Sequence, residues 1–374
     1  MVDASPVVFE AVATADGQRV MRVRLNAEKS LNALSQAMID ALQPALDEWA
    51  ADPAVAAIFL EGTGEKAFCA GGDVVSLYHD MKQRPLGEPA PVAEHFFTTE
   101  YRLDHLVHTY PKPIVCWADG IVMGGGVGLL AGCSHGILTE RSRLAMPEMP
   151  LGLFPDVGGT YFLNRMPGRT GYFLGLTGEH VFGTDIFALG LGNYMIQSDQ
   201  REAVVDALAA ASWGTDERDR HETASRVLGD LWRAKDATGE TPFMDRYARI
   251  QELTDHATPG AVMAAIQSAA ESEEWLQSAA KGFKRACPVS LAVFDRQYRG
   301  GRHLSLTECF RRELCIAVQS SRRPDFREGV RALLVDKDRS PAWSVPSLAE
   351  VSDDVVDAHF ELPADYSTDP LADL

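Results

Sequence analysis

Hydrophobic and polar positions follow two different rhythms in the first half of the chain. Residues 20–25, Val-Met-Arg-Val-Arg-Leu, alternate apolar and basic side chains, which predicts a strand with one exposed face. Residues 32–51 carry apolar side chains at helical spacing, with Ser35 as the expected N-cap, whereas Pro44 argues against one straight helix. Further strands are predicted at 55–60, 114–117 and 136–139, and an apolar helix at about 124–131.

Beyond about Val157 the strand pattern nearly vanishes and helical spacing takes over. The expected helices lie at 203–211, 223–234, 244–253, 261–276 and 306–320. Strands that alternate with helices before this point indicate an α/β core. A chain of 374 residues is long for one domain, so we expect a core over 1–200 and a helical region over 201–374.

Charge and cysteine usage exclude several classes of protein. The net charge of −18 argues against non-specific nucleic-acid binding, which needs a basic surface. Residues 281–339 nevertheless hold 14 Lys and Arg against 7 Asp and Glu, a local net of +7 that could face an anionic ligand or the acidic body. The six cysteines have no disulfide or zinc spacing, and residues 1–6 have no secretory pattern. We therefore expect a cytoplasmic protein with no metal and no membrane span.

Two acids stand eight residues apart in an otherwise apolar stretch, 145–159. They are Glu148 and Asp156, and three prolines and three glycines around them rule out one continuous helix. Water-poor surroundings would raise the pKa of these carboxylic acids and suit them to acid, base or nucleophile chemistry. The alternative is a pair of solvated loop carboxylates, and the pattern alone leaves both open.

Two glycine-rich turns precede this stretch, each between a predicted strand and a predicted helix. They are 66–73, which contains Gly72, and 123–128, which contains Gly125. Backbone N–H groups in such turns can stabilise the oxyanion of an enolate or a tetrahedral intermediate, although each could also be only a tight turn. The G-x-S-x-G motif at 132–136 has a helix before it and a strand after it, which is the wrong order for a Ser134 nucleophile. Cys69 has no nearby histidine, so a packing role is favoured.

Together these segments resemble the enoyl-CoA hydratase/isomerase (crotonase) superfamily, and within it the 3-hydroxyisobutyryl-CoA hydrolases. The resemblance runs from about Val20 to Phe360. Its specific segments are 30–34, 66–73, 120–129, 145–162, 329–332 and 335–343. It implies an α/β crotonase-like core of repeated ββα units with a helical C-terminal region, and an acyl-CoA thioester as substrate. Coenzyme A then belongs to the substrate and no separate cofactor is implied.

The resemblance also implies roles for individual residues. The N–H groups of Gly72 and Gly125 correspond to the oxyanion hole. Glu148 corresponds to the catalytic glutamate and Asp156 to the aspartate of the hydrolase branch. Glu100, together with Gly125 and the two acids, corresponds to the substrate contacts. A second glutamate of the hydratases is replaced by Gly128, so hydration lacks one of its acids while the hydrolase set is complete.

The expected reaction is hydrolysis of 3-hydroxyisobutyryl-CoA, as in valine degradation, with Glu148 either as nucleophile or as general base. The alternatives are an enoyl-CoA hydratase/isomerase on the same scaffold and a non-catalytic crotonase-like binding protein. Lys281, Lys284 or Arg285 are expected to offset the phosphate charge of coenzyme A. The superfamily resemblance also allows a homo-oligomer.

Overall fold

The computed structural model describes residues 5–233 and 239–374, and these form two compact units. Unit 1 takes the described residues up to Gly72, Leu106–Leu144 and Val181–Met244. Unit 2 takes Asp73–His105, Ala145–His180 and Asp245–Leu374. The units group the chain by contacts in space, so each takes residues from both sides of position 200. The division into 1–200 and 201–374 stays a prediction.

The larger sheet of unit 1 has six strands in the order β1-β2-β3-β5-β7-β10. Their bounds are β1 Val7–Ala13, β2 Arg19–Leu25, β3 Val55–Gly62, β5 Ile114–Ala118, β7 His135–Leu138 and β10 Tyr194–Met195. β1 and β2 are antiparallel, and every other pair is parallel. All residues of β3 are buried, as expected for a central parallel strand covered on both faces. The strands predicted from the apolar pattern are confirmed.

The smaller sheet of unit 1 has the order β4-β6-β8-β9. The bounds are β4 Ala67–Cys69, β6 Ile121–Met123, β8 Arg143–Ala145 and β9 Val181–Phe182. β4 and β6 are parallel neighbours, with Ala67 beside Ile121 and Cys69 beside Val122. Because parallel strands end at the same edge of a sheet, the segments that follow β4 and β6 start from adjacent positions.

Helices of unit 1 cover the larger sheet. They are α1 Gln36–Ala51, α4 Gly125–Gly132, α7 Gly183–Ala188, α8 Arg201–Ala210 and α9 Glu217–Arg233. Phe59 and Trp117 of the sheet pack in one buried cluster with Leu208 of α8 and Leu228 of α9. Ser35 caps α1 by accepting the Met38 N–H (3.3 Å), as predicted. Pro44 lies inside α1, which runs without a break from Gln36 to Ala51.

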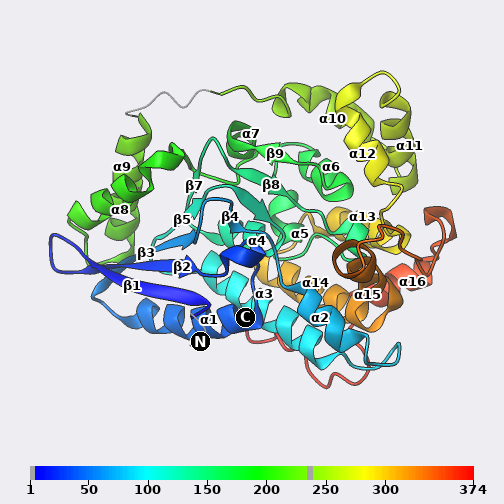
Figure 1. The fold of residues 1–374 in the computed structure, drawn as a ribbon, viewed down its shortest axis with the longest axis horizontal. Coiled ribbons are helices and arrows are strands. Elements are labelled where there is room, and N and C mark those ends of the chain that lie inside the picture. The colour runs from blue at the N-terminus through cyan, green and yellow to red at the C-terminus, as the bar shows by residue number, and fades with distance from the viewer. Residues whose placement is uncertain (1–4, 234–238) are drawn as a thin grey trace. The chain divides into compact units, whose positions relative to one another are not determined.

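Unit 2 is helical. Its helices are α2 Val74–Met81, α3 Pro91–His108, α5 Gly159–Leu163, α6 Thr170–Thr177, α10 Tyr247–Thr254, α11 Pro259–Ala269, α12 Gln277–Gly282, α13 Pro288–Gly301, α14 Leu306–Arg322, α15 Pro324–Val330 and α16 Asp353–Asp357. In Figure 1 the helices after residue 245 run from yellow to red, with no strand among them. The helix expected at 261–276 ends at Ala269, and a separate 3-10 turn covers Glu274–Leu276. Residue 234, expected at the end of α9, lies outside the described residues.

Among the helices in residues 5–233 and 239–374, none combines the length and the apolar character needed to cross a membrane.

Candidate active site

Glu148 and Asp156 lie on an irregular segment of unit 2, as the prolines and glycines predicted. A single 3-10 turn, Met149–Leu151, follows Glu148, and α5 begins three residues after Asp156, at Gly159. Gly152 ends the 3-10 turn with a φ of 71°, in the left-handed region that glycine adopts without steric cost. The chain thus presents two carboxyl groups from one short, non-helical loop.

Both carboxyl groups are buried, so the alternative of solvated loop carboxylates is wrong. Glu148 and Asp156 are each 4% exposed. Burial raises the pKa of Glu148 well above its usual range, and the charge of Asp156 raises it further. No described residue hydrogen-bonds Glu148 Oε2, although this oxygen is buried. A buried carboxyl with an unsatisfied oxygen costs stability and marks a candidate for reaction with a ligand.

The helix α3 supplies two further groups beside these acids. The hydroxyl group of Tyr101 donates a hydrogen bond to Asp156 Oδ2 at 2.7 Å. Burial raises the pKa of Asp156 to about 7, and the Tyr101 bond acts in the opposite direction. Glu100 is 2% exposed, and burial followed by the charge of Asp156 raises its pKa well above the usual range. The structure therefore brings Glu100, Glu148 and Asp156 together, as the resemblance implied.

The helix α14, in the C-terminal region, contributes a fourth acid, Glu313, which the sequence analysis missed. Its side chain is fully buried and accepts the N–H groups of Gly158 (2.8 Å) and Thr160 (2.7 Å). Burial raises its pKa to about 8, while these N–H groups act to lower it. One signal was available: Glu313 adjoins Leu314 and lies three residues from Phe310, on the apolar face of a predicted helix. Tyr101 was missed too, although it adjoins Glu100 in the sequence.

Other C-terminal residues hold the same loop in place within unit 2. The N–H group of Cys287 donates to the Met149 carbonyl (3.0 Å), and Gln297 Nε2 donates to the Pro155 carbonyl (2.9 Å). A Cβ atom on Gly152 would lie 2.3 Å from the Asp325 carbonyl oxygen, so only glycine fits there. The loop that carries both acids therefore takes its shape from residues more than a hundred positions later.

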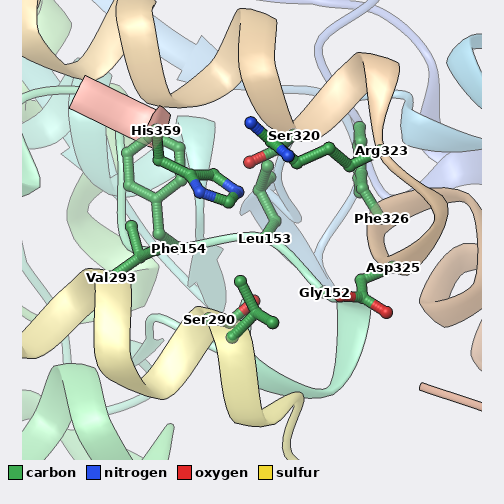
Figure 2. A pocket seen from close by; sticks show the side chains of 11 residues that line it. Gly152, Leu153, Phe154, Ser290, Val293, Ser320, Arg323, Asp325, Phe326 and His359 are labelled. Carbon is green, nitrogen blue, oxygen red and sulfur yellow. The ribbon is translucent and has the colours of Figure 1, made fainter. Parts of the chain in front are cut away.

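Figure 2 shows a pocket that is lined by Leu153 and Phe154 of this loop and by Ser320, Arg323 and His359. The space open to a water-sized sphere is about 10 Å³, which is room for about one water molecule. It is too small for an acyl-CoA.

The two glycine turns belong to unit 1 and lie side by side. Gly71 has a φ of +110°, and a Cβ atom on it would lie 3.5 Å from the Met123 carbonyl oxygen. A Cβ atom on Gly126 would lie only 2.3 Å from the Cys69 carbonyl oxygen, so the two turns pack at backbone distance. Gly125 is the first residue of α4, and its N–H group has no acceptor within that helix. The residue following Gly71, Gly72, pairs with Leu34 in an isolated bridge.

Two competing nucleophiles have structural roles. Ser134 follows α4 and precedes β7, which confirms the order predicted from the sequence, and its hydroxyl oxygen accepts the Ile114 N–H (3.1 Å). Cys69 is fully buried, and its thiol lies 3.7 Å from the Gly71 carbonyl oxygen. The Ser134 hydroxyl oxygen also lies 2.8 Å from Nδ1 of the adjacent His135.

The basic segment 281–339 contains both buried, ion-paired and exposed basic residues. Arg322 is buried and pairs with Glu94 and Asp365, each at 2.8 Å, within unit 2. Lys281 and Lys284, at the end of α12 and just beyond it, are exposed. Part of the positive charge therefore serves internal ion pairs, and part faces solvent.

Comparisons with known proteins agree with this architecture. The sequence model of the family described as enoyl-CoA hydratase/isomerase matches residues 20–360. The mitochondrial 3-hydroxyisobutyryl-CoA hydrolase of Danio rerio is 35% identical over 363 residues, covering 95% of this chain and 89% of that protein.

Solved structures match over nearly the whole chain. An enoyl-CoA hydratase from Rhodobacter sphaeroides has a TM-score of 0.82 at 31% identity, covering 96% of this chain and 98% of that one. A carnitinyl-CoA dehydratase from Mycobacterium thermoresistibile has a TM-score of 0.85 at 30% identity, covering 98% and 99%. The α/β crotonase-like fold with a helical C-terminal region is confirmed, and the chain belongs to the enoyl-CoA hydratase/isomerase family.

Proposed function

We propose that this protein hydrolyses an acyl-CoA thioester, with 3-hydroxyisobutyryl-CoA as the substrate and 3-hydroxyisobutyrate and coenzyme A as the products. The observation that carries the proposal is the buried pair Glu148 and Asp156 on one loop, with a tyrosine hydroxyl fixed on Asp156. The curated relative at 35% identity is named for this activity. The reaction places the protein in valine degradation.

The chemistry assigns each group a task. The N–H groups of Gly72 and Gly125 polarise the thioester carbonyl and stabilise the oxyanion. Glu148 either attacks the carbonyl carbon to give a mixed anhydride, or takes a proton from a water molecule that attacks it. The C–S bond breaks, the thiolate leaves and takes up a proton, and water supplies the second oxygen of the product acid. Asp156 and Glu100 bind the substrate, with Asp156 oriented toward its 3-hydroxyl group. No cofactor is required beyond the coenzyme A of the substrate.

Absence of a second glutamate favours hydrolysis over hydration. Position 128 is a buried glycine in α4, which has no side chain to activate water for addition to a double bond. The two solved relatives named hydratase and dehydratase share the fold, so the fold alone does not choose between the reactions. We expect release of the coenzyme A thiol from 3-hydroxyisobutyryl-CoA, and hydration of an enoyl-CoA at a far lower rate. The reverse order of rates would replace the proposal with the hydratase.

Removal of the Glu148 charge tests the catalytic role. In Glu148→Gln we expect thiol release to fall by at least about 100-fold, because proton transfer or nucleophilic attack is lost. The matched control is Glu271→Gln, the same change at an exposed position. Unchanged turnover in Glu148→Gln would support the non-catalytic binding protein instead.

A single turnover in ¹⁸O-labelled water separates the two routes. Label in the Glu148 carboxyl group supports the anhydride, because label enters there only when water attacks the Glu148 carbonyl carbon of that anhydride. Label confined to the product acid means that water attacked the acyl carbon, as the general-base route requires.

Location and assembly are part of the same proposal. All six cysteines are free thiols, which suits a reducing compartment, and we propose the cytoplasm. The name of the curated relative contains the word mitochondrial, so cell fractionation is the direct test. We also propose that copies of the chain associate, which sedimentation of the purified protein would measure.

A further inference from the structure

The backbone turn that follows Asp156 is strained. Val157 has a φ of 53°, and Gly158 has a φ of 86°. A left-handed conformation is costly for a β-branched residue, and it persists only where the surroundings hold it. Val157 is 1% exposed, so its side chain is enclosed as well. The strain therefore lies one residue from a proposed catalytic carboxyl group.

Glu313 binds the backbone of this turn through two hydrogen bonds. Its Oε2 accepts the Gly158 N–H at 2.8 Å, and its Oε1 accepts the Thr160 N–H at 2.7 Å. One donor belongs to the strained turn and the other to the start of α5, while the N–H group of Gly159 between them donates to the Asp156 carbonyl oxygen at 2.7 Å. Glu313 is itself rigidly placed, because it is fully buried and belongs to the 17-residue helix α14, whose start carries a capping box.

A second side chain binds the same turn. Gln297 Nε2, on α13, donates to the Pro155 carbonyl (2.9 Å) and to Thr160 Oγ1 (2.7 Å). Hydrogen bonds thus reach the backbone just before Asp156 and just after Val157. The Tyr101 hydroxyl in turn donates to the Asp156 carboxyl group itself at 2.7 Å.

We infer that Glu313 is a positioning residue for Asp156: by accepting the N–H groups of Gly158 and Thr160 it keeps Val157 left-handed and so directs the Asp156 carboxyl group. This inference rests on the proposed function, in which Asp156 acts on the substrate. A role limited to capping α5 would require the two N–H bonds but would not depend on the conformation of Val157. The two roles therefore differ in their response to substitutions at position 157.

Glu313→Gln is the first variant, because it keeps the shape of the side chain and replaces one acceptor oxygen with a donor. We expect kcat for thiol release to fall about 10- to 100-fold, as for a displacement of about 1 Å, with KM changed less than about threefold. Hydrogen exchange of the Gly158 and Thr160 amides should speed up on the order of tenfold. The exchange measurement needs no substrate.

Val157→Gly is the rescue variant, and Val157→Ala is its matched control. Both remove most of the buried side chain, but only glycine adopts the left-handed conformation without steric cost. In the Glu313→Gln background, we expect Val157→Gly to recover most of the lost kcat and Val157→Ala to recover none. If Glu313→Gln alone does not fold, the same pair of double variants decides, because only the glycine variant should then yield folded protein.

The outcomes separate the inference from the proposed function. Wild-type protein that releases no thiol overturns the proposed function, while the amide exchange still tests the effect of Glu313 on the turn. If the wild type releases thiol and Glu313→Gln retains the wild-type kcat and amide exchange rates, the inference is overturned and the proposed function stands. Equal effects of glycine and alanine at position 157 also overturn it, since the loss would then come from capping and not from the left-handed turn.

Discussion

Asp156→Asn is expected to make the protein less active and more stable. The amide keeps the size of the carboxyl group, and its oxygen can still accept the Tyr101 hydroxyl bond now made at 2.7 Å. Removal of the charge should lower kcat for thiol release by about 100-fold or more, because an acid that handles protons or orients the substrate is lost. The gain in stability follows from the burial of this group, which is 4% exposed.

The size and sign of that gain come from the pKa of Asp156. Burial raises it from the ordinary 3.8 to about 7, so between these values the folded protein binds a proton that the unfolded chain has released. The free energy of unfolding of the wild type therefore falls as pH rises from about 4 to 7, by about 4 kcal/mol at 1.36 kcal/mol for each pH unit. Asparagine does not titrate, so the variant escapes this loss.

A constant cost acts against the gain but does not alter its pH dependence. The asparagine adds a buried NH₂ group, which costs about 1 to 3 kcal/mol if unpaired. The net gain at pH 8 is then about 1 to 3 kcal/mol, and below pH 4 the variant should be no more stable than the wild type. Loss of the Asp156 charge also removes one cause of the raised pKa values of Glu148 and Glu100, which acts in the same direction.

Urea unfolding at pH 4, 6 and 8 measures this difference. The control is Asp206→Asn, the same change at an exposed position of α8, which should shift stability little at any pH. The reasoning is refuted if the stability of Asp156→Asn relative to the wild type does not increase between pH 4 and pH 8. It is also refuted if Asp206→Asn shows the same increase.

Three further predictions test other parts of the molecule. Tyr101→Phe removes the hydrogen bond to Asp156 that opposes the effect of burial. The pKa of Asp156 should then rise by about 1 to 2 pH units, which infrared titration measures, and an unchanged pKa would contradict this. Charge reversal of Lys281 and Lys284 to Glu should raise KM for acyl-CoA at low salt and leave kcat nearly unchanged, whereas Lys29→Glu, an exposed lysine of unit 1, should not. Gly126→Ala places a Cβ atom 2.3 Å from a backbone oxygen of the other glycine turn, so kcat should fall about 100-fold; near wild-type turnover would exclude a role for these turns.

The sequence predicted several local structures closely. The N-cap Ser35 and the buried face of α1 followed from helical spacing alone, because the period of the apolar side chains fixes which face of a helix is buried. The same holds for the irregular loop between Glu148 and Asp156, where prolines and glycines exclude a helix. Pro44 argued against one straight helix, and α1 nevertheless runs through this position, because packing of the buried face outweighs the local cost of one proline.

The sequence pattern did not predict whether the two acids are buried or solvated, and therefore did not predict their pKa values. Two carboxyl groups on a Pro/Gly loop were compatible with solvent or with a buried site, since a sequence does not state which other segments cover a loop. In unit 2 the loop is covered by α3, α13 and α14, and that burial is what raises the pKa of Asp156 to about 7. The resemblance to the family favoured catalytic acids over solvated ones, but the physical cause of the raised pKa is the packing of these helices around the loop.

What the sequence determined by itself was therefore a part of the elements, the two glycine turns and the two acids that match the family, whereas α3 and α13 were not predicted. Tertiary structure alone decided the partners of those acids. Tyr101 is 55 positions from Asp156, and Glu313 is 155 positions from Gly158, so no local period relates them. Hydrogen bonds at that separation depend on how whole helices pack, and the left-handed Val157 turn that they hold has no signature in its own residues.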